Sequence, residues 1–261
     1  MLTLLSPAKK LDFSPAPHPR ASRPVLMEET AKLATTARRL SKAKIKAMMS
    51  LSDDLAKLNH ERFQAFDADK NDQGFPAALA FAGDVYRGLD ARSLPGEDLL
   101  WAQDHLRMLS GLYGVLRPLD AIQPYRLEMG TKLHTRRGET LYDFWGARIA
   151  KALKADLESH DERAVVNLAS DEYFKAVDVK ALGAPVVSFK FQDVKDGKAR
   201  SLFLYVKLAR GMMARWMIDN RIDCVEGLKD FNVEGYKFEP GDSSGDVWVY
   251  KRKQPPAKKA A

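Results

Sequence analysis

The chain has 261 residues, of which 45% are hydrophobic and 30% charged, and its formal net charge is +7. This balance is typical of a folded globular protein and excludes global disorder. No apolar run approaches the roughly 18–20 residues of a membrane-spanning helix, so a spanning protein is excluded as well.

The ends and the cysteine content predict where the protein works. The segment Met1–Leu5 lacks the basic start and long apolar run of a secretion signal, and Cys224 is the single cysteine, so an internal disulfide cannot form. We therefore expect a cytoplasmic protein without a membrane partner.

The first half of the chain is predicted to be mostly helical after one strand. Residues 3–5 read as a short buried strand that Ser6 and Pro7 end. Apolar residues at helical spacing follow over 26–40, less regularly over 45–66, and again over 99–109, where Ser110 and Gly111 form a stop signal.

The second half alternates between helical and strand patterns. A helix is expected over 141–153, strands over 164–169 and 187–191, a hairpin turn at Asp196-Gly197 with a return strand over 202–206, a helix over 208–222, and a closing hairpin of 236–238 with 247–250. This alternation predicts an α/β fold with a mixed sheet and surrounding helices. We expect one domain over 1–250, a helical insertion at about 25–145, and a basic flexible tail over 251–261.

The positive charge is unevenly distributed. Residues 251–261 carry five basic residues and no acidic one, so the rest of the chain has a net charge of +2. Basic residues also gather in 32–46, 105–138 and 195–215, and together these segments would form a positive face able to bind phosphates. Deleting 251–261 is then expected to spare binding to DNA.

Polar residues follow two of the predicted strands. Ser6 and Lys9 come after the first, and Ser170, Asp171 and Glu172 come after the strand over 164–169. If these strands are parallel neighbours, the five residues converge on one crevice and are candidate catalytic groups, with Lys9 as a nucleophile or electrostatic stabiliser and Glu172 as a general acid or base. Capping of a following helix explains Ser170 to Glu172 equally well. The scattered histidines indicate no metal site, and no nucleotide-binding glycine motif indicates a cofactor.

The segment 105–120 reads as a helix, a glycine turn and a second helical start. Such an arrangement presents free backbone N–H groups to phosphates, as in a helix-hairpin-helix DNA-binding element. Gly111 and Gly114 enclose two residues instead of the usual one, so an ordinary turn between helices remains the alternative. Further candidate contacts to DNA are the basic and aromatic residues Arg107, Arg117, Tyr125, Arg126, Lys207 and Arg210.

Several motifs together resemble the YaaA family of bacterial peroxide-stress proteins. They lie at 5–9, 81–86, 106–114, 124–130 and 167–174. The resemblance implies a cytosolic protein that limits oxidative damage and free iron, with a positively charged cleft and a helix-hairpin-helix-like element that binds duplex DNA. That element would comprise Ser110, Gly111, Leu112, Tyr113 and Gly114.

Three functional hypotheses follow. The first is sequence-independent binding of duplex DNA, which neutralising Arg107, Arg117 and Arg126 would weaken. The second is an enzyme that acts on a damaged base or a nucleotide-like small molecule in the crevice of Ser6, Lys9, Ser170 and Glu172. The third is an iron-handling protein, although no His or Cys cluster favours it.

Overall fold

A central sheet organises the computed structural model, which describes residues 1–255. Its strand order is β11-β12-β9-β8-β1-β5-β6, with β10 paired to β9. The inner strands from β12 to β5 are parallel, and β11, β10 and β6 join as antiparallel hairpin partners. The sheet strands are β1 (Leu2–Leu5), β5 (Leu106–Ser110), β6 (Gly114–Leu116), β8 (Val165–Asn167), β9 (Val186–Lys195), β10 (Lys198–Arg200), β11 (Lys237–Phe238) and β12 (Val247–Lys253). The predicted α/β class with a mixed sheet is confirmed.

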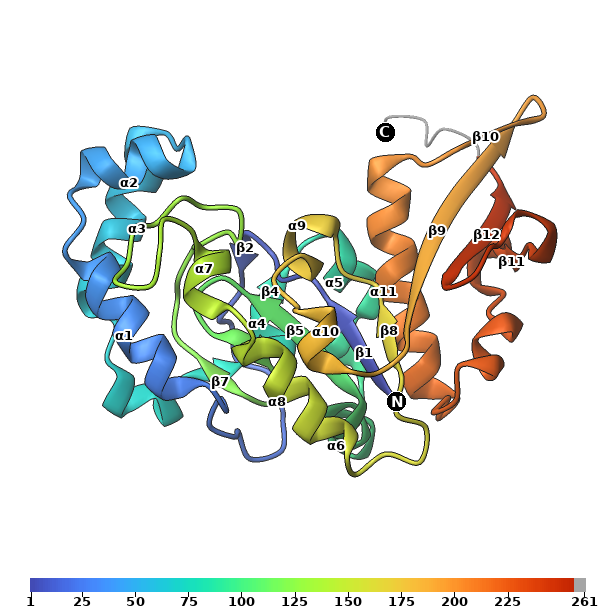
Figure 1. The fold of residues 1–261 in the computed structure, drawn as a ribbon, viewed down its shortest axis with the longest axis horizontal. Coiled ribbons are helices and arrows are strands. Elements are labelled where there is room, and N and C mark those ends of the chain that lie inside the picture. The colour runs from blue at the N-terminus through green and yellow to red at the C-terminus, as the bar shows by residue number, and fades with distance from the viewer. Residues whose placement is uncertain (256–261) are drawn as a thin grey trace.

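Helices cover both faces of this sheet. In Figure 1, α8 and α10 lie in front of it, and α6 and α11 lie behind. The helices are α1 (Met27–Arg38), α2 (Lys42–Met49), α3 (Asp53–Ala65), α4 (Ala77–Ala80), α5 (Asp84–Leu89), α6 (Gly96–His105), α7 (Leu141–Trp145), α8 (Arg148–Leu157), α9 (Asp171–Phe174), α10 (Val179–Leu182) and α11 (Phe203–Asp219). Two small ladders, β2 (Lys10–Leu11) with β4 (Phe81–Ala82) and β3 (Phe75–Pro76) with β7 (Ala121–Ile122), join the loops around α4. No helix within residues 1–255 combines the length and the apolar character that crossing a membrane requires.

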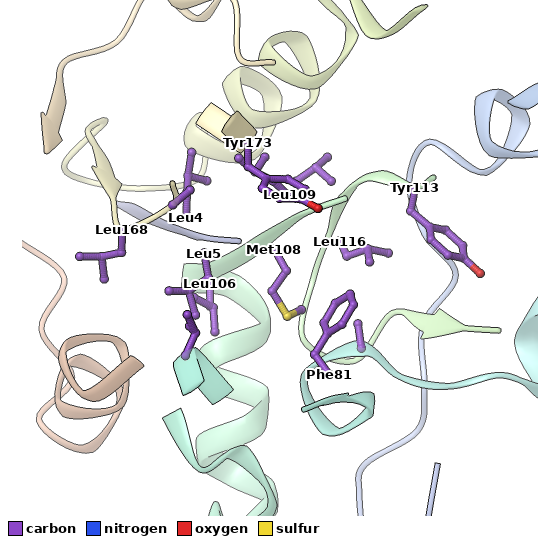
Figure 2. Packing of buried hydrophobic residues seen from close by; sticks show 14 of the residues in the cluster. Leu4, Leu5, Phe81, Leu106, Met108, Leu109, Tyr113, Leu116, Leu168 and Tyr173 are labelled. Carbon is purple, nitrogen blue, oxygen red and sulfur yellow. The ribbon is translucent and has the colours of Figure 1, made fainter. Parts of the chain in front are cut away.

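Residues buried on both faces explain the parallel arrangement. All residues of β1, β5 and β8 are buried, as expected for strands with helices on both sides. Figure 2 shows Leu4 and Leu5 of β1 beside Leu106 and Met108 of β5. By contrast, β9 alternates between buried and more exposed residues along most of its length, because its sheet face is covered on one side only.

The connections that follow two adjacent central strands, β1 and β8, lead to opposite sides of the sheet. The chain leaves β1 and enters the sheet again at β5 on one side, whereas it leaves β8 and returns at β9 on the other side. Ligands of open α/β sheets bind outside the carboxyl ends of the strands at such a switch point. Here those ends are Leu5 of β1 and Asn167 of β8.

Three local predictions are wrong. The helix expected over 99–109 ends at His105, and 106–110 form a strand of the main sheet, so the expected helical insertion at 25–145 contains sheet strands. The return strand expected over 202–206 lies instead in and around the first turn of α11, and the strand partner of β9 is Lys198–Arg200.

The basic tail expected over 251–261 is also corrected in part. Residues 251–253 belong to β12, and Arg252 pairs in register with Asp193 of β9. The Arg252 and Asp193 side chains form an ion pair at 2.7 Å and are both almost completely buried. Residues 256–261 lie outside the described part of the chain.

Candidate functional site

The switch point brings together the two serines that were predicted to converge. Ser6 follows β1 directly, and its Oγ accepts a hydrogen bond from the backbone N–H of Ser170 at 2.8 Å. The Ser6 hydroxyl in turn donates to Ser170 Oγ at 3.2 Å. Both residues are half-buried. We define the switch-point cluster as Ser6, Lys9, Glu128, Ser170 and Glu172.

Ser170 occupies the N-cap position of α9 without acting as a cap. Its side chain makes no hydrogen bond to the backbone of that helix and contacts Ser6 instead. Glu172 also points away from its own helix, since its Oε1 accepts the backbone N–H of Gly130 at 2.9 Å. Tyr142 donates its hydroxyl to the Glu172 carbonyl at 2.9 Å. The capping explanation therefore does not account for these side chains.

Charged groups lie on the loop that follows Ser6 and on the loop at 126–128. Lys9 Nζ lies 2.9 Å from Glu128 Oε2, and Arg126 binds Oε1 of the same carboxylate. The Lys9 side chain is 65% exposed, and a pair this exposed contributes little to stability, so its amine is free to exchange partners. Burial lowers the pKa of Arg210 on α11, and the negative charge of Asp171, which follows Ser170 directly, opposes that effect.

Three buried phenols lie behind the cluster. Tyr86 donates its hydroxyl to the Ser6 carbonyl at 3.0 Å, and the Tyr125 hydroxyl is 2.7 Å from Ser110 Oγ. Burial raises the pKa of Tyr86, Tyr125 and Tyr173 well above the ordinary value. All three phenols are therefore protonated at neutral pH.

The helix-hairpin-helix prediction at Ser110–Gly114 is wrong. These residues connect β5 to β6 as a strand–turn–strand hairpin, and every one of them is buried. Gly111 is required by packing, because a Cβ there would lie 2.2 Å from the Leu127 carbonyl oxygen. Gly114 has a φ of +72°, and a Cβ there would meet the ring of Trp145. The remaining residues of the turn, Leu112 and Tyr113, point into the core.

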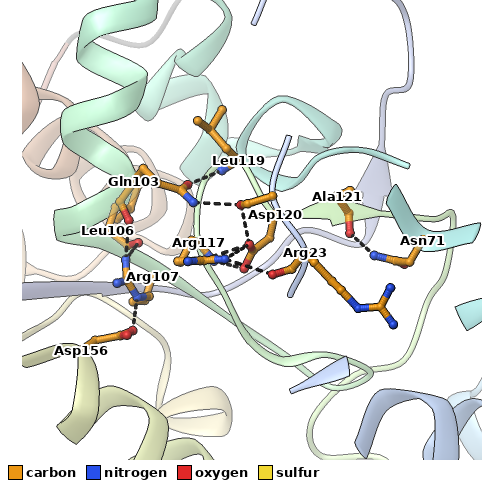
Figure 3. A network of polar contacts seen from close by, with 11 residues as sticks. Arg23, Asn71, Gln103, Leu106, Arg107, Arg117, Leu119, Asp120, Ala121 and Asp156 are labelled. Atoms are coloured by element: carbon orange, nitrogen blue, oxygen red, sulfur yellow. Dashed lines mark hydrogen bonds and ion pairs between the residues drawn. The ribbon is translucent and has the colours of Figure 1, made fainter. Parts of the chain in front are cut away.

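Ion pairs within the protein neutralise three of the arginines that were predicted to bind DNA. Arg107 is buried and contacts Asp156 at 2.6 Å, whereas Arg117 binds Asp120, which is itself buried. Figure 3 shows both pairs within one polar network that also includes the Gln103 side chain. Arg126 is engaged by Glu128.

Of the other candidate residues, Tyr125 is buried, and Lys207 and Arg210 on α11 are partly exposed. Lys207 Nζ lies 4.0 Å from the centroid of the Phe203 ring.

A basic pocket lies elsewhere, between α1 and the loop over 131–138. Its volume is about 680 Å³, and two of the basic segments recognised in the sequence meet there. No carboxylate belongs to its lining within residues 1–255. The lining residues are Lys32, Thr35, Thr36, Arg39, His134, Thr135, Arg136, Arg137 and Phe144.

Glu29, on α1, forms ion pairs with two of the basic residues that line this pocket. Its carboxylate binds Arg137 and Lys32, and the hydrogen bond from Arg137 is the main reason why the pKa of Glu29 falls to about 2. Arg39 and Arg136 are exposed and form no ion pair with any described residue. Two cations therefore remain available to an anionic ligand.

A helical hairpin adjoins this pocket in sequence and in space. The helices α2 and α3 pack together around a turn in which Ser50 adopts a left-handed conformation, with a φ of +51°. Ser41 and Ser52 cap the two helices through their side chains. The two capping serines are visible in the sequence. The helix-hairpin-helix prediction was nevertheless made for the glycine turn at 111–114, because the left-handed residue between α2 and α3 is Ser50 and not a glycine.

Sequence reasoning missed several members of the switch-point environment. Glu128 and the phenols of Tyr86, Tyr142 and Tyr173 reach it from segments that are remote in the chain. Tyr86, Glu128 and Tyr173 lie within the motifs at 81–86, 124–130 and 167–174, so those motifs were the available signal. Among residues 1–255, no group of three or more His, Cys, Asp or Glu side chains is placed to hold a metal ion.

Comparisons with known proteins cover nearly the whole chain. Residues 1–242 match the family described as peroxide stress protein YaaA. A UPF0246 protein of Maricaulis maris is 57% identical over 265 residues, covering 100% of both chains. Others from Phenylobacterium zucineum and Caulobacter vibrioides are each 54% identical, covering 98% of this chain and 96% and 100% of theirs.

Proposed function

Because the chain belongs to the peroxide stress protein YaaA family, we propose that it serves in peroxide stress by binding duplex DNA through its phosphates. The basic pocket carries this proposal, since it combines cations and hydroxyl groups without a lining carboxylate among the described residues. Arg39 and Arg136 would bind phosphates directly, and the hydroxyls of Thr35 and Thr36 would add hydrogen bonds.

The α2–α3 hairpin extends the proposed surface. Lys42 and Lys44 are exposed on α2 and have no ion pair within residues 1–255, whereas Lys46 is paired with Asp53. A duplex on the basic pocket would meet this helix next. Contacts of this kind read the backbone and carry no base information, so we expect binding independent of sequence.

The salt dependence of duplex affinity tests this proposal. Each neutralised phosphate contributes about −0.9 to the slope of log K against log salt, so four cations would give a slope of roughly −3 to −4. Replacing Arg39 and Arg136 with alanine should make the slope shallower by about 2 and weaken binding at low salt.

A matched variant controls for total charge. Lys198 and Arg200 are exposed on β10, at the opposite end of the structure from α1 in Figure 1, so replacing both with alanine removes the same charge from another face. This variant should bind like the parent chain. Equal losses in the two double variants would contradict a localised site, and wild-type binding without salt dependence would contradict phosphate binding altogether.

A further inference from the structure

The hydroxyl of Ser170 has a proton that the fold does not use. Ser170 Oγ accepts from the Ser6 hydroxyl, makes no cap hydrogen bond to α9, and is not a donor to any described residue. Ser6, by contrast, uses its oxygen and its proton on Ser170 alone. Ser6 therefore positions Ser170, whose half-buried hydroxyl can donate to a ligand at the end of the sheet.

Groups of both charges belong to the loops that meet at this hydroxyl. Lys9 is mostly exposed, and its single ion pair with Glu128 can yield to a stronger anion. Glu172 uses Oε1 to hold Gly130, and its Oε2 has no hydrogen bond within residues 1–255. The cluster can thus bind an anion at Lys9 and a hydroxyl group at Glu172.

The backbone around the cluster is held from several sides. Tyr86 fixes the carbonyl of Ser6, Tyr142 fixes the carbonyl of Glu172, and a Cβ on Gly83 would lie only 3.3 Å from the side chain of Ala8. The three loops that carry the polar groups are also joined to one another, by the hydrogen bonds from Ser170 to Ser6 and from Gly130 to Glu172 and by the ion pair of Lys9 with Glu128. A site built in this way loses little conformational freedom on binding.

We propose that the switch-point cluster binds a phosphorylated sugar, either free or as part of a nucleotide. Lys9 and the Ser170 hydroxyl bind the phosphate, and the Glu172 carboxylate accepts a hydrogen bond from a sugar hydroxyl. Carboxylates at the switch point of other nucleotide-binding sheets bind ribose hydroxyls in the same manner. This site is separate from the basic pocket and does not depend on the proposed binding of duplex DNA.

Calorimetric titration of the full chain with ribose 5-phosphate, AMP, inorganic phosphate and adenosine tests the proposal. Ribose 5-phosphate or AMP should bind at least tenfold more tightly than inorganic phosphate or adenosine, because only the first two offer both phosphate and ribose. Tighter binding of ribose 5-phosphate assigns the free sugar as the source, and tighter binding of AMP assigns the nucleotide. Absence of binding by both, or equal binding of inorganic phosphate, overturns the proposal.

Variants identify the site and separate it from the DNA-binding surface. Lys9→Met and Ser170→Ala should each weaken the sugar phosphate at least tenfold, whereas Lys198→Met, on an exposed hairpin residue, should leave it unchanged. Lys9 is exposed, so its variant will fold even if Ser170→Ala does not. The Arg39 and Arg136 double variant should keep full sugar-phosphate affinity while its duplex binding weakens. Undiminished binding by Lys9→Met would overturn the assignment.

Discussion

Ser6 and Ser170 are 164 residues apart in sequence, yet the backbone N–H of Ser170 donates to Ser6 Oγ at 2.8 Å. This bond joins the loops that follow β1 and β8, the two parallel strands from which the chain continues to opposite sides of the sheet. It places a serine hydroxyl, a lysine and two carboxylates at the edge where such sheets bind ligands.

The different roles of three N-cap serines can be measured. Ser52→Ala removes a side-chain cap from α3 and should lower the free energy of unfolding by about 1 kcal/mol. Ser170→Ala removes no cap and should cost less than Ser52→Ala. Urea denaturation of both variants checks this, with Ser41→Ala as a second capped serine. An equal or larger loss for Ser170→Ala would show that its hydroxyl is structural.

The close contact of α5 and α11 depends on glycine. A Cβ on Gly211 would lie 1.8 Å from the Val85 carbonyl oxygen, so Gly211→Ala must push the two helices apart. We expect a loss of about 3 kcal/mol or more, because overpacking against a backbone cannot be relieved by a rotamer change. Gly241→Ala meets no atom within 4 Å and serves as the control. Thermal unfolding of the two variants should separate them clearly.

The pair of Arg252 and Asp193 makes β12 part of the core. Both side chains are almost completely buried, so Arg252→Ala leaves an unpaired charge and should cost about 3–5 kcal/mol. The exposed pair of Lys46 and Asp53 is the control, and Lys46→Ala should cost less than about 1 kcal/mol. Deletion from residue 251 onward would then unfold the protein, contrary to the expectation from sequence. A folded, stable Arg252→Ala chain would contradict this role.

Glu29 should make stability depend on acidic pH. Hydrogen bonding by Arg137 lowers its pKa from 4.5 to about 2, so the folded protein favours the ionised carboxylate. The resulting stabilisation, about 2–3 kcal/mol, is present in full above pH 4.5 and is lost as the pH falls towards 2. The difference in unfolding free energy between wild type and Glu29→Gln should therefore be constant from pH 7 to 5 and shrink below 4.5. A difference that grows on acidification would have the wrong sign.

The sequence predicted β1 and β8 because their signals are local, whereas the neighbouring strand β5 was predicted as the end of a helix. Short apolar strands followed by Ser6 and by Ser170 were sufficient to place both residues at one edge. Arg107 could not be placed in this way, since its partner Asp156 comes from α8, 49 residues later. A charged residue inside a buried strand becomes stable only through that remote partner.

The same reason explains the misread C-terminal segment. Lys251 to Lys253 have the composition of a frayed end, and only pairing with β9 and the buried Asp193 makes them a strand. The role of Gly111 is likewise set by packing, because the backbone at Leu127 leaves no room for a side chain at this position. Contacts distant in sequence thus overrode composition and turn chemistry at both places.

Hydrogen exchange of the full chain, with and without duplex DNA, tests most directly where DNA binds. The proposed surface predicts slower exchange over 131–138 and over 39–46 when the duplex is present, and unchanged exchange in α8 and in the β9–β10 hairpin. Protection confined to the β9–β10 hairpin or α8, or no protection at any segment under saturating duplex, would contradict binding at the basic pocket.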